Sequence, residues 1–159
     1  MLQVGQQAPN FAAPNQDGRT VSLDDFRGKK RVVLYFYPKD DTPGCTVEAN
    51  QFTELAEEFR KYDTVIIGVS RDPCESHRRF IEKYGLKVDL LADTEGEICK
   101  AYRVLYEKVK DGEKRLSVKR STFVIDREGK IVYAQYGVKP EGHAREVLEF
   151  VKTLHSQTA

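Results

Sequence analysis

The chain has 159 residues, of which 40% are hydrophobic and 32% charged. Domains usually have ~100–200 residues, so we expect one domain over residues 1–159, large enough to bury a core without disulfide support. The 26 basic and 25 acidic residues leave a formal net charge of +1. This balance excludes a general electrostatic attraction to nucleic acid or to an anionic membrane.

Two features of the sequence indicate the compartment. The longest apolar run, residues 32–37, is far shorter than the ~18–20 residues of a membrane span, and residues 1–7 lack the pattern of a signal peptide. The three cysteines are an odd number, which favours reduced thiols over an extracellular disulfide framework. We therefore expect a cytoplasmic protein with no membrane and no nucleic-acid partner.

The first half of the chain predicts a strand–helix–strand unit. A turn cluster at residues 14–18 predicts an N-terminal β-hairpin. Residues 31–37 and 64–69 are continuous apolar runs, typical of strands that are covered on both faces. Between them, one amphipathic helix is expected from Cys45 to Tyr62. Its apolar stripe consists of Phe52, Leu55, Ala56 and Phe59.

The second half continues the alternation of helices and strands. We expect Asp72 to cap a helix whose first residue is Pro73 and which ends at Gly85. The other expected elements are a strand at 88–91, a short helix around 98–102, a hairpin tip at 111–112, a hairpin of 121–125 and 130–134, and a helix at 144–154. Together they predict an α/β domain with a central mixed β-sheet flanked by helices.

Residues 38–45 carry the clearest chemical signal. They lie between the carboxyl end of a buried strand and the start of a helix, the edge where α/β sheets usually bind ligands. In the first helical turn, unpaired N–H groups and the helix dipole favour the thiolate form of Cys45. Thr42 is close enough to point its hydroxyl into the same pocket. The structural alternative is that Cys45 is a small residue packed against the strand.

The pattern Pro38-x-x-x-Thr42-x-x-Cys45 resembles the active-site motif of the peroxiredoxins. Residues 42–46, Thr-Pro-Gly-Cys-Thr, resemble the subfamily called bacterioferritin comigratory protein or peroxiredoxin Q. The resemblance runs from Gly5 to about Leu154 and includes residues 120–126 and 137–143.

This resemblance implies a thioredoxin-like fold and a thiol-dependent peroxidase for antioxidant defence, without a metal or an organic cofactor. It implies hydrogen peroxide and alkyl hydroperoxides as substrates, a thioredoxin-like thiol donor, and a monomer. Cys45 would be the peroxidatic cysteine that becomes a sulfenic acid, Thr42 and Arg120 would complete the peroxide site, and Pro38 would shield it. An arginine suits that role because its planar fork of donors reaches both a sulfur and an oxygen. Without the resemblance, a solvated Arg120 at the start of a strand would be the default interpretation.

The sulfenic acid must then be reduced by a second thiol. Many members of the subfamily have a resolving cysteine five residues after the peroxidatic one, but here that position is Asn50. Cys74 is the resolving candidate, because it also opens a helix after a buried strand; a structural role is equally open. A disulfide needs Cα atoms within ~7 Å, and helices on opposite faces would require local unfolding. Cys99 is expected in the core, and an external thiol is the one-cysteine alternative.

Other interpretations have less support. A Cys-x-x-Cys disulfide reductase is disfavoured because Thr42 stands where the first cysteine would be. Cys74 and His77 have half the spacing of a zinc site, but no second pair follows, so His77 is expected to pack beside apolar residues of its helix. A cysteine hydrolase would need a histidine near Cys45, and the sequence gives none of the three histidines that placement. The basic residues between positions 108 and 120 are interleaved with acidic residues, which is typical of a solvated surface.

A non-catalytic interaction or chaperone module with a thioredoxin fold is the alternative function. In that case Cys45 would be incidental, and the three thiols would be equally slow toward peroxide.

Overall fold

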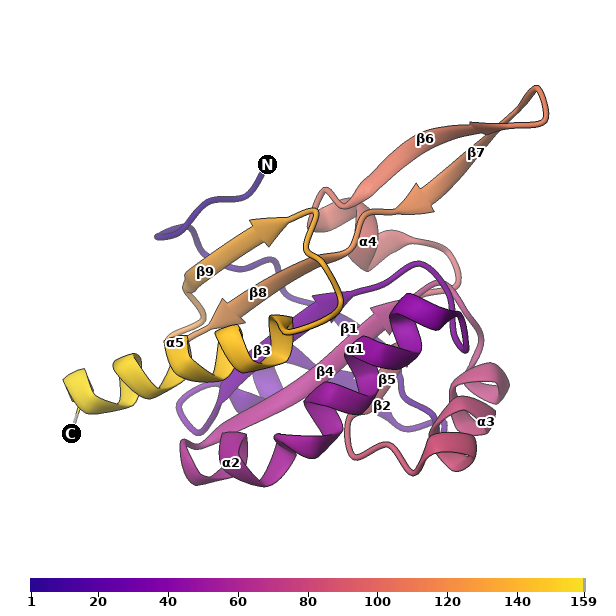
Figure 1. Ribbon diagram of the computed structural model, residues 1–159. Coiled ribbons are helices and arrows are strands. Elements are labelled where there is room, and N and C mark those ends of the chain that lie inside the picture. The colour runs from indigo at the N-terminus through magenta and orange to yellow at the C-terminus, as the bar shows by residue number, and fades with distance from the viewer. Residues whose placement is uncertain (159) are drawn as a thin grey trace.

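A five-stranded mixed sheet forms the centre of the computed structural model, which describes residues 1–158 and side chains as far as His155 (Figure 1). Its strand order is β5-β4-β3-β8-β9. The strands are β3 (Arg31–Phe36), β4 (Thr64–Ser70), β5 (Asp89–Ala92), β8 (Ser121–Ile125) and β9 (Ile131–Tyr136). β3 is parallel to β4 and antiparallel to β8, so the expected mixed sheet is confirmed.

The central strand β3 is buried along its whole length, as its continuous apolar sequence predicts. Side chains of a strand alternate between the two faces. Leu34 and Phe36 therefore enter one core and Val33 and Tyr35 the other. The sheet thus separates two hydrophobic clusters, each of which needs its own cover.

Helices cover one face and shorter elements the other (Figure 1). The first face carries α1 (Pro43–Glu54), α2 (Ala56–Lys61), α3 (Cys74–Tyr84) and α5 (His143–Thr158). The second carries α4 (Glu97–Ala101), the 3-10 helix η1 (Leu23–Phe26) and the predicted N-terminal hairpin of β1 (Ala12–Pro14) and β2 (Thr20–Ser22). Because Phe80 of α3 packs in the same cluster as Cys45, α1 and α3 share a face.

The helix expected from Cys45 to Tyr62 is two helices. It begins earlier, with Thr42 as N-cap and Pro43 as the first residue, and it breaks at Leu55. There the backbone leaves the helical region (φ −99°, ψ 2°), and one N–H is shared between the carbonyls of Gln51 and Phe52. The last turn of α1 is therefore tighter and redirects the chain at Leu55, although the sequence has no glycine or proline there to indicate a break.

The expected N-cap role of Asp72 is wrong. Pro73 occupies the cap position of α3, which has no side-chain cap bond, while Gly85 ends the helix in the left-handed conformation as predicted. The Asp72 carboxylate instead accepts hydrogen bonds from the Ser70 hydroxyl (2.6 Å) and the Asp40 N–H (2.8 Å). It therefore joins the loop before α1 to the end of β4.

His77 is fully buried, but its partners are polar rather than the apolar neighbours that the sequence predicts. Its Nε2 donates to the Leu91 carbonyl (2.9 Å), and its Nδ1 lies 2.7 Å from Asp40 Oδ2. Asp40 also accepts from the hydroxyls of Tyr37 (2.6 Å) and Ser76 (2.7 Å). Both ring nitrogens thus face oxygen atoms. This pair fastens the loop before α1 to α3.

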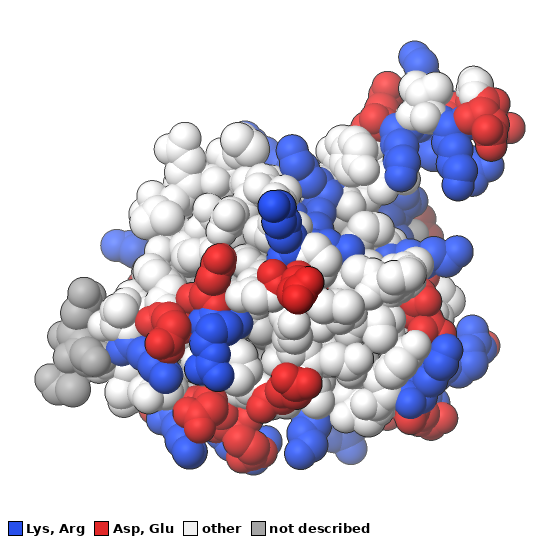
Figure 2. Space-filling model, in the orientation of Figure 1, with Lys and Arg blue, Asp and Glu red and all other residues white. Residues whose placement is uncertain are grey.

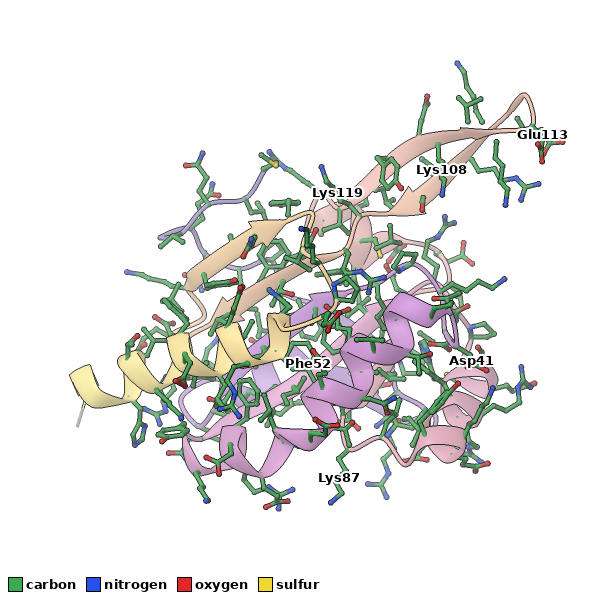
Figure 3. All side chains as sticks on the ribbon, in the orientation of Figure 1. Asp41, Phe52, Lys87, Lys108, Glu113 and Lys119 are labelled. Carbon is green, nitrogen blue, oxygen red and sulfur yellow. The ribbon has the colours of Figure 1, made fainter. Side chains whose placement is uncertain are left out.

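A second contact fastens the same loop. Asp41 has a positive φ of 57°, and its carboxylate accepts from Lys83 Nζ (2.7 Å) and the Tyr84 hydroxyl (2.6 Å). Figure 3 shows Asp41 beside α3.

The hairpin of β6 (Leu105–Lys110) and β7 (Glu113–Val118) projects away from the rest of the fold (Figure 1). Its side chains are mostly exposed, and Lys or Arg alternate with Asp or Glu (Figure 2). The β6–β7 hairpin is therefore solvated and of mixed charge, as expected. Among residues 1–158, the structure has no helix long and apolar enough to cross a membrane.

We expect His77→Leu to destabilise the protein by about 1–3 kcal/mol, because it leaves the buried Asp40 carboxyl group without the imidazole as hydrogen-bond partner. Urea denaturation followed by circular dichroism measures this loss. The matched control is the double variant Asp40→Asn/His77→Leu, which also replaces the Asp40 carboxyl group by an amide and should be more stable than His77→Leu alone. Wild-type stability of the single variant would contradict a stabilising hydrogen bond between the two side chains.

Candidate active site

Cys45 is the third residue of α1 and is only 1% exposed. Strand β3 delivers the chain to the carboxyl edge of the sheet, and the loop fastened by Asp40 and Asp41 turns it into the helix. The sulfur therefore lies where the first N–H groups of α1 have no partner within the helix. The structure thus places the sulfur in the first turn of a helix, as the sequence predicts.

Arg120 is brought to Cys45 from 75 residues away. Its Nη2 donates to the Cys45 sulfur (3.4 Å), and its Nη1 donates to Glu48 Oε1 (2.8 Å). The Arg120 side chain is 15% exposed, so it is not the solvated arginine of the alternative interpretation. Arg120 thus places a positive charge in contact with the sulfur.

Gly44 leaves the space that this contact needs. A Cβ at this position would lie 3.0 Å from Arg120 Nη2 and 3.4 Å from the Pro140 ring. Any side chain here would press on the guanidinium that reaches the sulfur.

Glu48 is the site residue that the sequence analysis missed. It lies one helical turn after Cys45 on the same face, and this i, i+3 spacing is the signal that could have indicated it. Burial raises the pKa of Glu48 to about 7, although the charge and hydrogen bond of Arg120 act in the opposite direction. Because the buried Glu48 carboxylate accepts a hydrogen bond from Arg120, it fixes the direction in which the guanidinium points.

Thr42 is placed beside the site but uses its hydroxyl proton elsewhere. It is the N-cap residue of α1 without capping the helix by its side chain, and its Oγ1 donates to the Lys39 carbonyl (2.9 Å). With that proton committed, the oxygen faces its surroundings as an acceptor. A ligand at this site would therefore meet the Thr42 hydroxyl as an acceptor.

Pro38 lies beside Arg120 at a surface cavity. It is exposed and lines a cavity of about 500 Å³ with Tyr106, Val118, Lys119 and Arg120. Figure 3 shows Lys119 at the base of the β6–β7 hairpin, so the cavity connects the hairpin to the active-site arginine.

The other two cysteines have different surroundings, and all three are free thiols. Cys74 is the first residue of α3, is half-buried and lines a cavity of about 470 Å³ beside the turn of the N-terminal hairpin. Cys99 is fully buried in the cluster on the other face of the sheet, as predicted. Burial, together with a hydrogen bond to Asp93, raises the pKa of Cys99. Cys99 is therefore an unreactive core residue.

The histidines do not complete a cysteine–histidine pair. His77 bonds to Asp40 and Leu91, and His143 shares a 2.8 Å hydrogen bond with Thr122 Oγ1, while burial lowers the pKa of His143. His155 lies against Arg31 and Tyr62. No group of three or more potential metal ligands occurs in the part of the chain that the structure describes.

Comparisons with known proteins identify the family of the chain. The model of the AhpC/TSA family matches residues 4–134. A putative peroxiredoxin bcp of Coxiella burnetii is 44% identical over 147 residues, which cover 92% of this chain and 97% of the relative. Peroxiredoxin Bcp of Bacillus subtilis is 42% identical over 153 residues, which cover 96% of this chain and 97% of the relative.

Solved structures agree as well. The bacterioferritin comigratory protein of Xanthomonas campestris, studied for its alkyl peroxide reduction activity, superposes with a TM-score of 0.89 at 36% identity, over 96% of this chain and 99% of that chain. A cysteine-to-serine mutant of PrxQ from Xylella fastidiosa gives a TM-score of 0.90 at 34% identity, over 96% and 97%. The chain therefore belongs to the AhpC/TSA family and is, within it, a peroxiredoxin of the Bcp or PrxQ type, a thiol-dependent peroxidase with a thioredoxin-like fold.

Proposed function

We propose that Cys45 is the peroxidatic cysteine and that it reduces hydrogen peroxide and alkyl hydroperoxides. The 3.4 Å contact between Arg120 Nη2 and the Cys45 sulfur carries this assignment. The thiolate attacks the terminal peroxide oxygen, the O–O bond breaks, and the departing oxygen leaves as water or an alcohol after it takes up a proton. Cys45 becomes a sulfenic acid, oxidised by two electrons. The alkyl substrates follow the activity studied in the Xanthomonas relative.

Ionisation of the sulfur supplies only part of the rate. A free cysteine is a few per cent thiolate at pH 7, so complete ionisation raises its rate at most about 30-fold. The larger share must come from alignment of the O–O bond with the sulfur and from stabilisation of the departing oxygen. Arg120 has further N–H groups beside those used by Glu48 and Cys45, and these are the donors for a peroxide oxygen.

Thr42 and Pro38 have supporting roles in this proposal. The Thr42 oxygen, whose own proton goes to Lys39, accepts a hydrogen bond from the peroxide O–H. Pro38 forms the apolar rim of the cavity beside Arg120 and limits the access of water to the reacting oxygen.

Cys74 is proposed as the resolving residue. Its thiolate attacks the Cys45 sulfenic acid, the oxygen leaves as water, and a disulfide forms. The thioredoxin-like donor then returns two electrons. Three observations support this role: α1 and α3 follow the adjacent parallel strands β3 and β4, they share one face of the sheet, and Cys74 is partly exposed whereas Cys99 lies on the other face.

The same proposal includes the oligomeric state and the cellular compartment. We propose a monomer in the cytoplasm, where three free thiols are stable. The non-catalytic module loses its basis, because the family and the site geometry both favour a peroxidase.

Cys45→Ser should abolish peroxide turnover, because the oxygen of serine is not ionised at neutral pH and is a far weaker nucleophile. Peroxide consumption coupled to a thioredoxin system measures this loss. Cys99→Ser is the matched control and should keep most of the activity. Equal losses in the two variants would contradict the assignment.

Arg120→Lys should slow the oxidation of Cys45 by about 100-fold or more, because lysine keeps the charge but loses the fork of donors. The chain has no tryptophan, so rapid quenching with an alkylating reagent and mass spectrometry measures the rate. The loss should persist at alkaline pH, where the thiol is fully ionised. If the loss of rate disappears at alkaline pH, the only role of Arg120 is to promote ionisation of the sulfur.

Peroxide treatment should give a disulfide between Cys45 and Cys74, which peptide mapping under non-reducing conditions identifies. Cys74→Ser should still oxidise Cys45 at the wild-type rate, but should accumulate sulfenic acid and lose multiple turnover with thioredoxin. Wild-type turnover of this variant would instead assign resolution to an external thiol.

A further inference from the structure

Two buried polar atoms stand out beneath the active site. Over the described side chains, Tyr35 Oη and Glu48 Oε2 are the buried side-chain oxygen or nitrogen atoms without a hydrogen-bond partner. Tyr35 is 1% exposed and Glu48 is completely buried. A buried polar group without a partner is costly, so each of these atoms needs an explanation.

Both side chains are buried on the inner side of helix α1. The Tyr35 ring stacks on Phe52, with centroids 4.7 Å apart and planes inclined by 22°. Phe52 lies one helical turn after Glu48 and therefore on the same face of α1. Burial first, and then the charges of Glu48 and Cys45, raise the pKa of Tyr35 well above its ordinary value. The phenol thus keeps its proton and remains a donor beside the carboxylate.

Strand β4 is shaped for this hydroxyl. A Cβ on Gly68 would lie 2.9 Å from Tyr35 Oη and 2.8 Å from Tyr35 Cζ. Glycine inside a strand has an entropic cost and contributes no packing. The sheet therefore accepts a glycine at the position where the Tyr35 phenol group needs the space.

We propose that Tyr35 is a positioning residue of the peroxide site: its hydroxyl shares a hydrogen bond with Glu48 Oε2 and so holds the carboxylate that directs Arg120 to Cys45. The hydrogen bond passes through one water molecule, because neither oxygen has a direct hydrogen-bond partner. This role of Tyr35 rests on the proposed roles of Cys45 and Arg120. Tyr35 touches no reacting atom and acts only through Glu48.

A tyrosine fits this place because its hydroxyl pairs with both forms of the carboxyl group. It donates to the ionised carboxylate, and it accepts from the protonated acid. Glu48 can therefore gain or lose its proton near neutrality without losing its second anchor. Phenylalanine would preserve the stacking on Phe52 but would remove this anchor.

The Glu48 titration provides the direct test. Tyr35→Phe should move the midpoint of this titration upward by about one pH unit, because the ionised carboxylate loses a donor. NMR of protein labelled with ¹³C at the glutamate carboxyl group measures the midpoint, and the signal that disappears in Glu48→Gln identifies the residue. Tyr102→Phe is the matched control: it also removes a buried phenol hydroxyl, one that donates to the Pro9 carbonyl from the opposite core cluster, and should leave the midpoint unchanged.

The kinetic test asks whether Tyr35 acts through Glu48. Tyr35→Phe should slow the oxidation of Cys45 about tenfold in the wild-type background and should have no further effect in Glu48→Gln. An unchanged Glu48 midpoint, or an equal loss in both backgrounds, would overturn the proposal. Urea denaturation verifies that each variant folds. If wild-type Cys45 itself does not react with peroxide, the proposed function fails, while the NMR titration still decides whether Tyr35 contacts Glu48.

Discussion

The guanidinium of Arg120 lies between a buried carboxylate and a buried sulfur, and separate parts of the chain must be placed correctly for this contact to exist. Helix α1 supplies Cys45 and Glu48, and the residues between β7 and β8 supply Arg120. Gly44 leaves the necessary space. Removing these charges from water costs several kcal/mol, which is recovered only where partners face each other closely. The sheet and the loop that follows β3 provide that precision.

Much of the fold could be predicted from patterns that depend on local sequence. The apolar run of β3, the turn residues of the hairpins and Gly85 at the end of α3 all specify structure over a few residues. The position of Cys45 at a helix start is a signal of the same kind. The contact between Arg120 and Cys45 was expected through the resemblance to peroxiredoxins, because no local pattern connects residues 75 positions apart.

The errors arose where tertiary contacts decide the outcome. Asp72 has the sequence of an N-cap, but its carboxylate binds the active-site loop instead. His77 lies on an apolar helix face, yet its ring bonds to the polar side chain of Asp40 from the loop before α1. The break at Leu55 has no marker residue. Asp40, the partner that Asp72 and His77 share, is more than 30 residues away from both, so no window of neighbouring residues contains it.

The fastening of the active-site loop to α3 also has an energetic consequence. Where formation of a disulfide between the start of α1 and the start of α3 displaces this loop, it works against the contact of Asp40 with His77 and against the contacts of Asp41. Any strain introduced in this way raises the reduction potential of the disulfide, and the bond is then given up more readily to a reducing protein. The contacts that hold the reduced site in order would thus favour its regeneration.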